Sequence, residues 1–220
     1  MVGHTKLERM DDFFAKRVDD YDGHMLGGVE GCAEAYRLIP LLLPNDTADL
    51  LDLGCGTGLE LGYIFGRFPQ LRATGVDISE AMTACLRRKF PDKPLKLING
   101  SYLGRNFGSM CFDAAVSCET MHHMSHAEKL SVYSAIRCAL RTSGRYIECD
   151  YVAPSQADED ARYAENARLR REQNIPVGEF YHYDTPCTVN NQIDLLMRAG
   201  FRSAEKVWQA GNTAVIAAFR

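Results

Sequence analysis

Short apolar runs alternate with segments of helical periodicity through the first two thirds of the chain. Runs of this kind are typical of strands that are buried on both faces of a parallel sheet. Apolar side chains recur at helical spacing between the runs, as with Met82, Cys85 and Leu86, and the sequence Ser143–Arg145 predicts a helix stop. Five β–α units in succession predict an α/β fold with a doubly wound sheet. The predicted strands span Asp49–Leu53, Ala73–Asp77, Leu95–Asn99, Phe112–Cys118 and Arg145–Tyr151.

The last third of the chain follows a different pattern. Residues Ala157–Glu172 form a highly charged helical segment, and an aromatic loop follows it. A further helix is predicted over Val189–Ala199, ending at Gly200. Two closing apolar runs flank Gly211 and Asn212, which together are a hairpin turn signal. The chain is therefore expected to end in an antiparallel strand pair.

Composition limits the possible partners. The 220 residues are 46% hydrophobic and 25% charged, which is ordinary for one soluble domain. The formal net charge of −4 argues against a nucleic-acid partner, because such a partner requires a concentrated lysine and arginine surface. The eight cysteines include no C-x-x-C pair, so they are interpreted as reduced residues of a cytoplasmic protein. No signal peptide and no apolar run of ~18 residues is present, so no membrane partner is expected.

A glycine-rich turn is the first candidate binding site. The sequence LLDLGCGTGLEL, Leu50–Leu61, passes from an apolar run into three glycines spaced two apart and then into a helical pattern. Glycine lacks a Cβ and tolerates positive φ, so the backbone of this turn can approach a ligand closely. A ribose, a phosphate or an amino-acid group fits such a turn. Taken alone, the triplet is a weak signal, because many tight turns carry glycine for structural reasons.

Two acidic residues narrow the choice of ligand. Asp77 ends the next strand, where a carboxylate can accept hydrogen bonds from both ribose hydroxyls of an adenosine. The alternative is that Asp77 caps a helix that begins near Ser79 or Glu80. Asp52 lies two residues before the first glycine, where a carboxylate would repel a pyrophosphate and attract an ammonium group. The pattern favours a ligand with an adenosine and an ammonium group over a dinucleotide.

With these residues the chain resembles the class I S-adenosylmethionine-dependent methyltransferases. The resemblance rests on LLDLGCGTG, GVDIS, FDAAVSCETMHHM and LRTSGRYIECDYV, which follow one another over residues 48–151. It implies a Rossmann-like, seven-stranded sheet of order 3-2-1-4-5-7-6 with strand 7 antiparallel. It also implies one methyltransferase domain over residues 1–220. Its parts would be a helical arm or lid (1–45), a cofactor-binding core (46–151), an insert over the substrate pocket (152–188), and a terminal helix with the antiparallel pair (189–220).

The resemblance implies S-adenosyl-L-methionine as the cofactor and assigns its contacts by position. The glycine turn would hold the methionine and ribose portion, with Asp52 near the amino group. Asp77 would bind the ribose hydroxyls, and Ile78 would pack on the adenine. Many relatives carry an acidic residue after the third strand, whereas this chain has Ser101, so a group near Ser101 and Tyr102 is expected to contact the adenine. The assigned cofactor residues are Asp52, Gly54, Cys55, Gly56, Gly58, Asp77, Ile78, Ser101, Tyr102 and Cys118.

The first candidate for catalysis is the segment CETMHHMSH after the fourth strand. It offers Glu119, His122, His123 and His126. A cluster of histidine and glutamate suggests a metal, but spacing alone does not show whether the ligands converge. Paired histidines are also frequent at this position in the family that the chain resembles. We therefore expect no metal, treat Glu119 and His122 as pocket-lining groups, and include His122 among the catalytic candidates.

The second candidate is the aromatic loop EFYHYDTPCT, Glu179–Thr188. His182 in this loop is the best-suited general base, because an unperturbed imidazole titrates at ~6.5. Aromatic side chains around it would exclude water from an acceptor pocket. The alternative is a structural turn in which Asp184 and Thr185 cap the following helix, and Thr188 is a further candidate for that cap.

The third candidate is the N-terminal arm. Arg17 and Tyr21 are spaced i, i+4 and would face the same way from one helix. Family members often fold such an arm over the cofactor, which makes Tyr21 a catalytic candidate and His24 a pocket residue. The alternative is that Phe13, Phe14 and Tyr21 simply pack the helix on the sheet. Three glycines after this helix are expected to form a hinge, Gly23, Gly27 and Gly28.

Together these features predict a cytoplasmic, S-adenosylmethionine-dependent methyltransferase. It would methylate an O or N atom of a small molecule and act as a monomer or homodimer. Two helical segments, Met10–Tyr21 and Ala157–Glu172, are expected to cover the cofactor cleft. The alternative is an S-adenosylmethionine-binding protein of the same fold with other chemistry or with a regulatory role.

Overall fold

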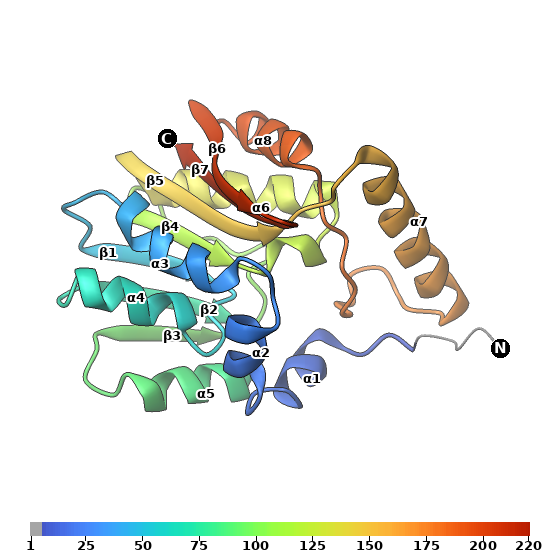
Figure 1. Cartoon of the computed structure of the whole chain (residues 1–220), viewed down its shortest axis with the longest axis horizontal. Coiled ribbons are helices and arrows are strands. Elements are labelled where there is room, and N and C mark those ends of the chain that lie inside the picture. Colours follow the sequence, from blue (N-terminus) through green and yellow to red (C-terminus); the bar gives the residue numbers. More distant parts are fainter. Residues whose placement is uncertain (1–5) are drawn as a thin grey trace.

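Seven strands form one sheet in the order β3-β2-β1-β4-β5-β7-β6 in a computed structural model that describes residues 6–220 (Figure 1). The β5–β7 and β7–β6 pairs are antiparallel, and the other pairs are parallel. This topology confirms the predicted fold, including the antiparallel pair around Gly211. The strands are β1 (Asp49–Leu53), β2 (Arg72–Asp77), β3 (Leu95–Asn99), β4 (Phe112–Cys118), β5 (Leu140–Tyr151), β6 (Ser203–Ala210) and β7 (Thr213–Phe219).

Helices cover both faces of the sheet, because the side chains of each parallel strand alternate between two cores. In β1, Leu50 packs in the core that contains Tyr36 and Ile64, whereas Leu51 packs in the core that contains Ile136. No helix within residues 6–220 is both long and apolar enough to cross a membrane. The helices are α1 (Met10–Ala15), α2 (Tyr21–Gly27), α3 (Cys32–Leu42), α4 (Leu59–Arg67), α5 (Glu80–Lys89), the 3₁₀ turn η1 (Met121–His123), α6 (His126–Ala139), α7 (Gln156–Glu172) and α8 (Val189–Arg198).

Strand β5 begins earlier than predicted. Helix α6 ends at Ala139, and the sequence Ser143–Arg145, predicted as a helix stop, lies inside the strand. The register against β4 shifts between Phe112 and Ala114, so the added residues are accommodated as a bulge. Glycine in a strand often marks such an irregularity, and here it does not end the helix.

The N-terminal arm is two short helices rather than the one helix predicted over Met10–Tyr21. A turn over residues 16–20 separates α1 from α2, so Arg17 and Tyr21 do not share a helix face. A continuous helix would place Asp19 and Asp20 in its C-terminal half, where negative charge opposes the helix dipole. At the start of α2 the same charges are favourable. Two of the glycines predicted as a hinge lie inside α2, and the third is its C-cap: Gly23, Gly27 and Gly28.

The arm pairs with the loop that follows α7, far away in the sequence. The amide of Met10 donates to the carbonyl of Phe180 (3.0 Å), and the amide of His182 donates to the carbonyl of Glu8 (2.9 Å). An isolated antiparallel bridge joins Arg9 to Tyr181. These bonds hold the loop and the arm together over the carboxyl edge of the parallel strands. Helix α7 extends away from the sheet beside them (Figure 1).

Gly58 at the start of α4 provides a test of close helix packing. Its φ is +77°, and a Cβ there would lie 2.2 Å from Leu86 Cδ1. We expect Gly58→Ala to lower the free energy of unfolding by about 1–3 kcal/mol, from the left-handed backbone and the overpacking together. Gly66 in the same helix has ordinary φ and open space around its Cα. Gly66→Ala should therefore be neutral or stabilising by up to about 1 kcal/mol. Urea unfolding measures both values, and equal effects would contradict this packing role.

Candidate functional site

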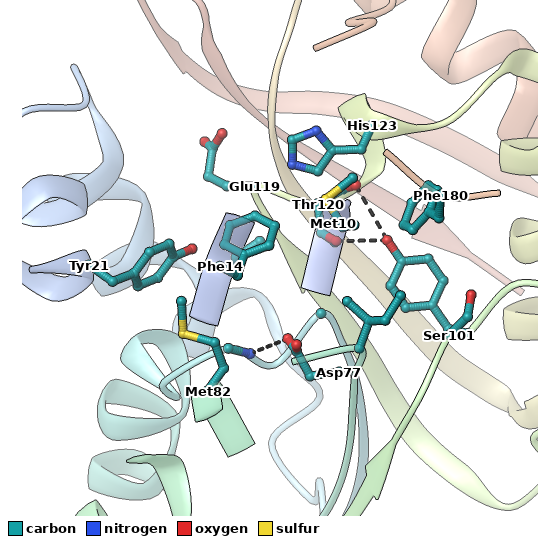
Figure 2. A pocket seen from close by; sticks show the side chains of 15 residues that line it. Met10, Phe14, Tyr21, Asp77, Met82, Ser101, Glu119, Thr120, His123 and Phe180 are labelled. Carbon is teal, nitrogen blue, oxygen red and sulfur yellow. Dashed lines mark hydrogen bonds between the residues drawn. The ribbon is translucent and has the colours of Figure 1, made fainter. Parts of the chain in front are cut away.

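The carboxyl ends of β1, β2 and β4 open into a cavity beneath the N-terminal arm. In Figure 2, Phe14 and Met10 lie across its centre, Glu119 and His123 stand at one end, and Asp77 stands at the other. The cavity encloses about 30 Å³, room for a single water molecule. Its lining residues are Met10, Phe14, Tyr21, Gly54, Gly56, Asp77, Ile78, Met82, Ser101, Tyr102, Cys118, Glu119, Thr120, His123 and Phe180.

The glycine turn contributes two of its four assigned residues to this lining. Gly54 has φ +68°, and a Cβ there would lie 2.5 Å from Thr120 Oγ1, so only glycine fits against Thr120. Gly56, with φ +46°, also faces the cavity. Cys55 and Gly58 do not line it. The Cys55 side chain is buried against Gly75, and the Cα of Gly58 packs closely against Leu86 of α5.

Asp77 ties the glycine turn to the start of α5. Its carboxylate accepts hydrogen bonds from the amides of Gly56 and Ser79, both at 2.8 Å. The side chain of Ser79, not that of Asp77, caps α5 by accepting from the amide of Met82. Burial raises the pKa of Asp77, and the two amide donors oppose that rise. Ser79, rather than Asp77, is therefore the side-chain cap of α5, and Asp77 lines the cavity.

The far wall of the cavity comes from the loops after β3 and β4. Tyr102 and Thr120 share a hydrogen bond between their hydroxyls (2.7 Å), and Ser101 Oγ accepts from the amide of Leu103 (3.0 Å). Cys118, the last residue of β4, also lines the cavity. Ser101, Tyr102 and Cys118, all predicted cofactor residues, therefore lie in the same lining. Sequence reasoning missed several lining residues, because neither spacing nor residue type marks them: Met10, Phe14, Met82, Thr120 and Phe180.

Asp52 lies away from the cavity surface. It is fully buried, and neither of its carboxylate oxygens receives a hydrogen bond from an N–H or O–H donor in the described part of the chain. Its neighbour is Glu60 on α4, which is also buried. Burial and the adjacent negative charge raise the pKa of Asp52, and burial raises that of Glu60. A proton on one of the two carboxyls would let that group donate a hydrogen bond to the other.

The Asp52–Glu60 pair predicts pH-dependent stability. Because the pKa of Glu60 is raised on folding, its contribution is fully present below the ordinary carboxyl range and is lost as pH rises toward neutrality. In Glu60→Gln the side-chain amide can donate a hydrogen bond to Asp52, and this amide does not titrate between about pH 5 and about pH 8. We expect the melting temperature of Glu60→Gln relative to wild type to be higher at about pH 8 than at about pH 5. Glu34→Gln, an exposed change on α3, is the control, and equal differences at both pH values would refute the proton between the two carboxyls.

A second, larger cavity adjoins the first. It measures about 690 Å³ and shares Phe14, Tyr21, Glu119 and His123 with the smaller one. Helix α7, predicted to cover the cleft, contributes no side chain to either lining, and the arm and the loop of residues 180–184 take that place. The other lining residues are Phe13, Arg17, Asp20, His24, Met25, Gly28, Val29, Glu30, His122, Tyr151, His182, Asp184, Asn212 and Thr213.

His122 is oriented by Asp150 at the end of β5. Its Nδ1 lies 2.6 Å from Asp150 Oδ1, and both side chains are buried. Burial alone would lower the pKa of His122, but the charge and hydrogen bond of Asp150, followed by the charges of Asp184 and Glu119, raise it to about 9. His122 is therefore protonated at neutral pH in the absence of another cation.

His182 stands opposite, on the loop that pairs with the arm. Its ring stacks on Phe13, with centroids 3.4 Å apart and planes at 7°. Burial, with the nearby charge of His123, lowers the pKa of His182 to about 4, so its imidazole is neutral. The residues of this loop that were predicted as helix caps have different roles in the structure. Thr188 caps α8, whereas Thr185 donates to the carbonyl of His122.

Glu119 and Tyr21 lie where the two cavities meet. Glu119 is buried in left-handed backbone, φ +49°, a conformation that is uncommon for a residue with a side chain. Burial raises the pKa of Glu119 well above its usual range. Burial and the charges of Glu60 and Glu119 likewise raise the pKa of Tyr21 well above its usual range. Tyr21 therefore keeps its phenol hydroxyl, a hydrogen-bond donor, at the wall common to the two cavities.

Comparisons with known proteins agree with this geometry. A family model described as a methyltransferase domain matches residues 50–144. A trans-aconitate 2-methyltransferase of Enterobacter sp. (strain 638) is 40% identical over 65 residues, 30% of this chain and 26% of that protein. An uncharacterized methyltransferase of Mycobacterium tuberculosis H37Rv is 25% identical over 118 residues, 54% of this chain and 58% of that protein. The chain therefore spans less than two thirds of the length of these relatives.

Solved structures show the same fold at low identity. A complex named DhpI-SAM-HEP has a TM-score of 0.70 at 16% identity and covers 95% of each chain. An S-adenosylmethionine-dependent methyltransferase of Thermotoga maritima has a TM-score of 0.67 at 16% identity, over 96% of this chain and 99% of that one. The fold and the glycine turn with Asp77 define a Rossmann-like domain that binds a nucleoside cofactor. Residues 50–144 thus match a methyltransferase domain, and the chain has the fold of solved S-adenosylmethionine-dependent methyltransferases, which supports S-adenosylmethionine as the cofactor.

Asp77 is the residue that tests this cofactor site most directly. If Asp77 binds the ribose as predicted, removing its carboxylate takes away that acceptor, and it also removes the hydrogen bond from the amide of Gly56. We expect Asp77→Ala to weaken S-adenosylmethionine binding by about 10- to 100-fold in calorimetry, the effect of losing charged hydrogen bonds. Asp92→Ala, an exposed change after α5, should bind like wild type, and circular dichroism confirms folding of both. Unchanged affinity in a folded Asp77→Ala protein would remove Asp77 from the site.

Proposed function

We propose that the protein transfers a methyl group from S-adenosylmethionine to an O or N atom of a small molecule. The observation that supports this most is the wall common to the two cavities. Phe14, Tyr21, Glu119 and His123 line both, so a donor in the smaller cavity meets an acceptor in the larger one. Methyl transfer is an in-line displacement that depends mainly on positioning and exclusion of water.

The residues of the smaller cavity fit the cofactor. Asp77 binds the ribose hydroxyls, Ile78 and Met82 pack on the adenine, and the backbone at Gly54 and Gly56 admits the remainder. When bound, the cofactor supplies an electrophilic sulfonium methyl group. Asp52 acts on the ammonium group only through the intervening backbone, because it is absent from the lining.

The N-terminal arm is the lid of this site. A cavity of about 30 Å³ is far smaller than a nucleoside, so Met10 and Phe14 must move outward for cofactor entry. The arm is held by backbone hydrogen bonds to the loop at Phe180 and His182, which break and reform without loss of the core. This supports the division into an arm (1–45), a core (46–151), an insert (152–188) and a terminal unit (189–220).

His182 accepts the proton of the acceptor. Its imidazole is neutral and lies in the larger cavity, so it can act as a general base toward a hydroxyl or ammonium group. His122 holds a proton and Tyr21 a phenol hydroxyl, and these two groups orient the acceptor rather than deprotonate it. Three acidic side chains line the cavity and disfavour an anionic acceptor, namely Asp20, Glu30 and Asp184.

A cytoplasmic enzyme that acts as a monomer or homodimer on a small metabolite agrees with the formal net charge of −4. The competing proposal is a protein of this fold that binds the cofactor for other chemistry or for regulation. Incubation with methyl-labelled S-adenosylmethionine and a panel of neutral hydroxyl and amine compounds separates the two. We expect labelled product and stoichiometric S-adenosylhomocysteine. Tight cofactor binding without product from the panel or from a metabolite extract would favour the competing proposal.

With an acceptor in hand, His182→Gln tests the base. Glutamine keeps a polar side chain of similar reach but does not accept a proton. We expect kcat to fall by about 10²- to 10⁴-fold, with little change in cofactor affinity. His126→Gln is the matched control, because His126 lies outside both linings and pairs with Glu159 (2.7 Å). If kcat falls equally in both variants, or in neither, His182 is not the base.

A further inference from the structure

Three imidazole nitrogens surround one carboxylate oxygen in the larger cavity. Asp184 Oδ1 lies 3.4 Å from His123 Nδ1, 3.7 Å from His122 Nε2 and 3.7 Å from His182 Nε2. The ligand atoms of His122, His123 and Asp184 all lie within 4.8 Å of one another. The four residues come from two segments, η1 and the loop before α8, that only the tertiary fold brings together.

These separations are too long for good hydrogen bonds, and the shortest, 3.4 Å, equals the separation of two ligands on one metal ion, whereas the 3.7 Å separations are slightly longer. An N–H···O bond has a heavy-atom distance of ~2.7–3.2 Å. Two ligands at ~2.0–2.1 Å from a tetrahedral ion are themselves ~3.3–3.4 Å apart. Small adjustments of the Asp184 side chain, which lies at the cavity rim, would bring the set to ligating distance.

The Nδ1 of His123 has only a long contact to a neighbouring group, 3.4 Å to Asp184 Oδ1. This atom is buried and makes no hydrogen bond within the described residues. A buried polar atom without a well-formed hydrogen bond is destabilising. This nitrogen points into the group formed with Asp184, and a cation there would supply the missing interaction.

Asp150 prepares His122 as a ligand. The Nδ1 of His122 bonds to Asp150, which leaves Nε2 as the nitrogen that faces Asp184. A carboxylate on the far nitrogen is the usual support of a metal-bound imidazole, since it sets the tautomer and the ring orientation. Asp150 and Asp184 together also carry two negative charges, which balance a divalent cation.

The loop that carries Asp184 is fastened to the segment that carries the histidines. The amide of Thr185 donates to the carbonyl of His122 (2.6 Å), and its hydroxyl is bonded to the carbonyls of His122 (3.0 Å) and Met124 (3.2 Å). Asp184 directly precedes Thr185, and the hydrogen bonds of Thr185 to His122 and Met124 therefore hold Asp184 close to the histidines. Ligands held on hydrogen-bonded backbone in this way are preorganised for an ion.

We propose that His122, His123 and Asp184 bind a divalent transition-metal ion of the zinc type in the acceptor cavity. Two imidazoles and one carboxylate are a common ligand set for such an ion, and a fourth position stays open for a water or an acceptor oxygen. This inference revises the expectation of no metal. It does not rest on the proposed methyl transfer, because binding of the ion is measured without cofactor or acceptor.

A second group of similar residues lacks the same preparation. His126, Glu159 and Cys187 also lie close together, but their ligand atoms already have partners. Lys129 Nζ donates to Cys187 Sγ (3.0 Å), and Glu159 accepts from His126 Nε2 (2.7 Å) and Asn191 Nδ2 (2.9 Å). The buried ammonium group of Lys129 would also repel a cation.

The test is metal titration of the untagged, full-length chain after treatment with a chelator. We expect calorimetry to show one Zn²⁺ per chain, and Co²⁺ to give the absorption bands of a four-coordinate site. His123→Ala and Asp184→Ala should each weaken Zn²⁺ binding at least ~10-fold, and Asp150→Asn should weaken it ~10- to 100-fold. His126→Ala, a histidine-to-alanine change three residues from His123, should bind like wild type.

Three results would overturn the proposal. They are a wild-type chain that binds no stoichiometric Zn²⁺, a His123→Ala chain with unchanged affinity, and a His126→Ala chain that loses the ion. The last result would move the ion to the Cys187 group. Circular dichroism identifies any variant that fails to fold. Asp150→Asn removes no proposed ligand but alters the support of His122. A changed Co²⁺ spectrum and a weaker affinity in this variant would show that His122 is a ligand, and unchanged values would show that it is not.

Discussion

Two hydrogen bonds to the carboxylate of Asp77 hold the centre of the molecule's binding edge together. One comes from the amide of Gly56 in the turn after β1, and the other comes from the amide of Ser79 before α5. A single side chain thus sets the spacing of two adjacent β–α turns. The cofactor cavity, the Ser79 cap and the close packing of Gly58 on Leu86 all depend on that spacing. A carboxylate suits the role because it accepts several hydrogen bonds at once.

Above this edge, the site is completed by segments that are far apart in the sequence. The N-terminal arm and the loop of residues 180–184 pair through backbone hydrogen bonds and together cover both cavities. Backbone pairing of this kind is reversible and has no large apolar core of its own. The same contact therefore covers the smaller cavity and supports His182 in the larger one.

Buried acids and imidazoles at the carboxyl edge differ because their surroundings differ. Asp52 and Glu60 are buried, and the pKa values of both are raised, whereas Asp150 pairs with His122 and orients its ring. His122 and His182 line one cavity, yet their pKa values shift in opposite directions, to about 9 and about 4. His182 has a neutral imidazole that can accept a proton. The neighbouring His122 and His123 face Asp184 and can bind a cation.

Much of the fold was readable from residue patterns. The strands Asp49–Leu53 and Phe112–Cys118, the hairpin at Gly211 and the positions of Gly54, Gly56 and Asp77 follow from local periodicity and residue chemistry, which act within a few residues. The apolar spacing predicted one continuous helix in the arm. Asp19 and Asp20, which are unfavourable near the C-terminal end of a helix, are consistent with the break at residues 16–20.

Other features depended on the tertiary structure alone. The exclusion of Asp52 from the cavity, the absence of α7 from both linings, and the convergence of His122 and His123 on Asp184 were not predictable from spacing. The last two depend on segments separated by tens of residues, whose relative placement is set by sheet order and loop pairing. The sequence by itself determined the sheet and the chemistry of its turns. Only the folded chain decided which side chains meet, because distance along a chain does not determine distance in space.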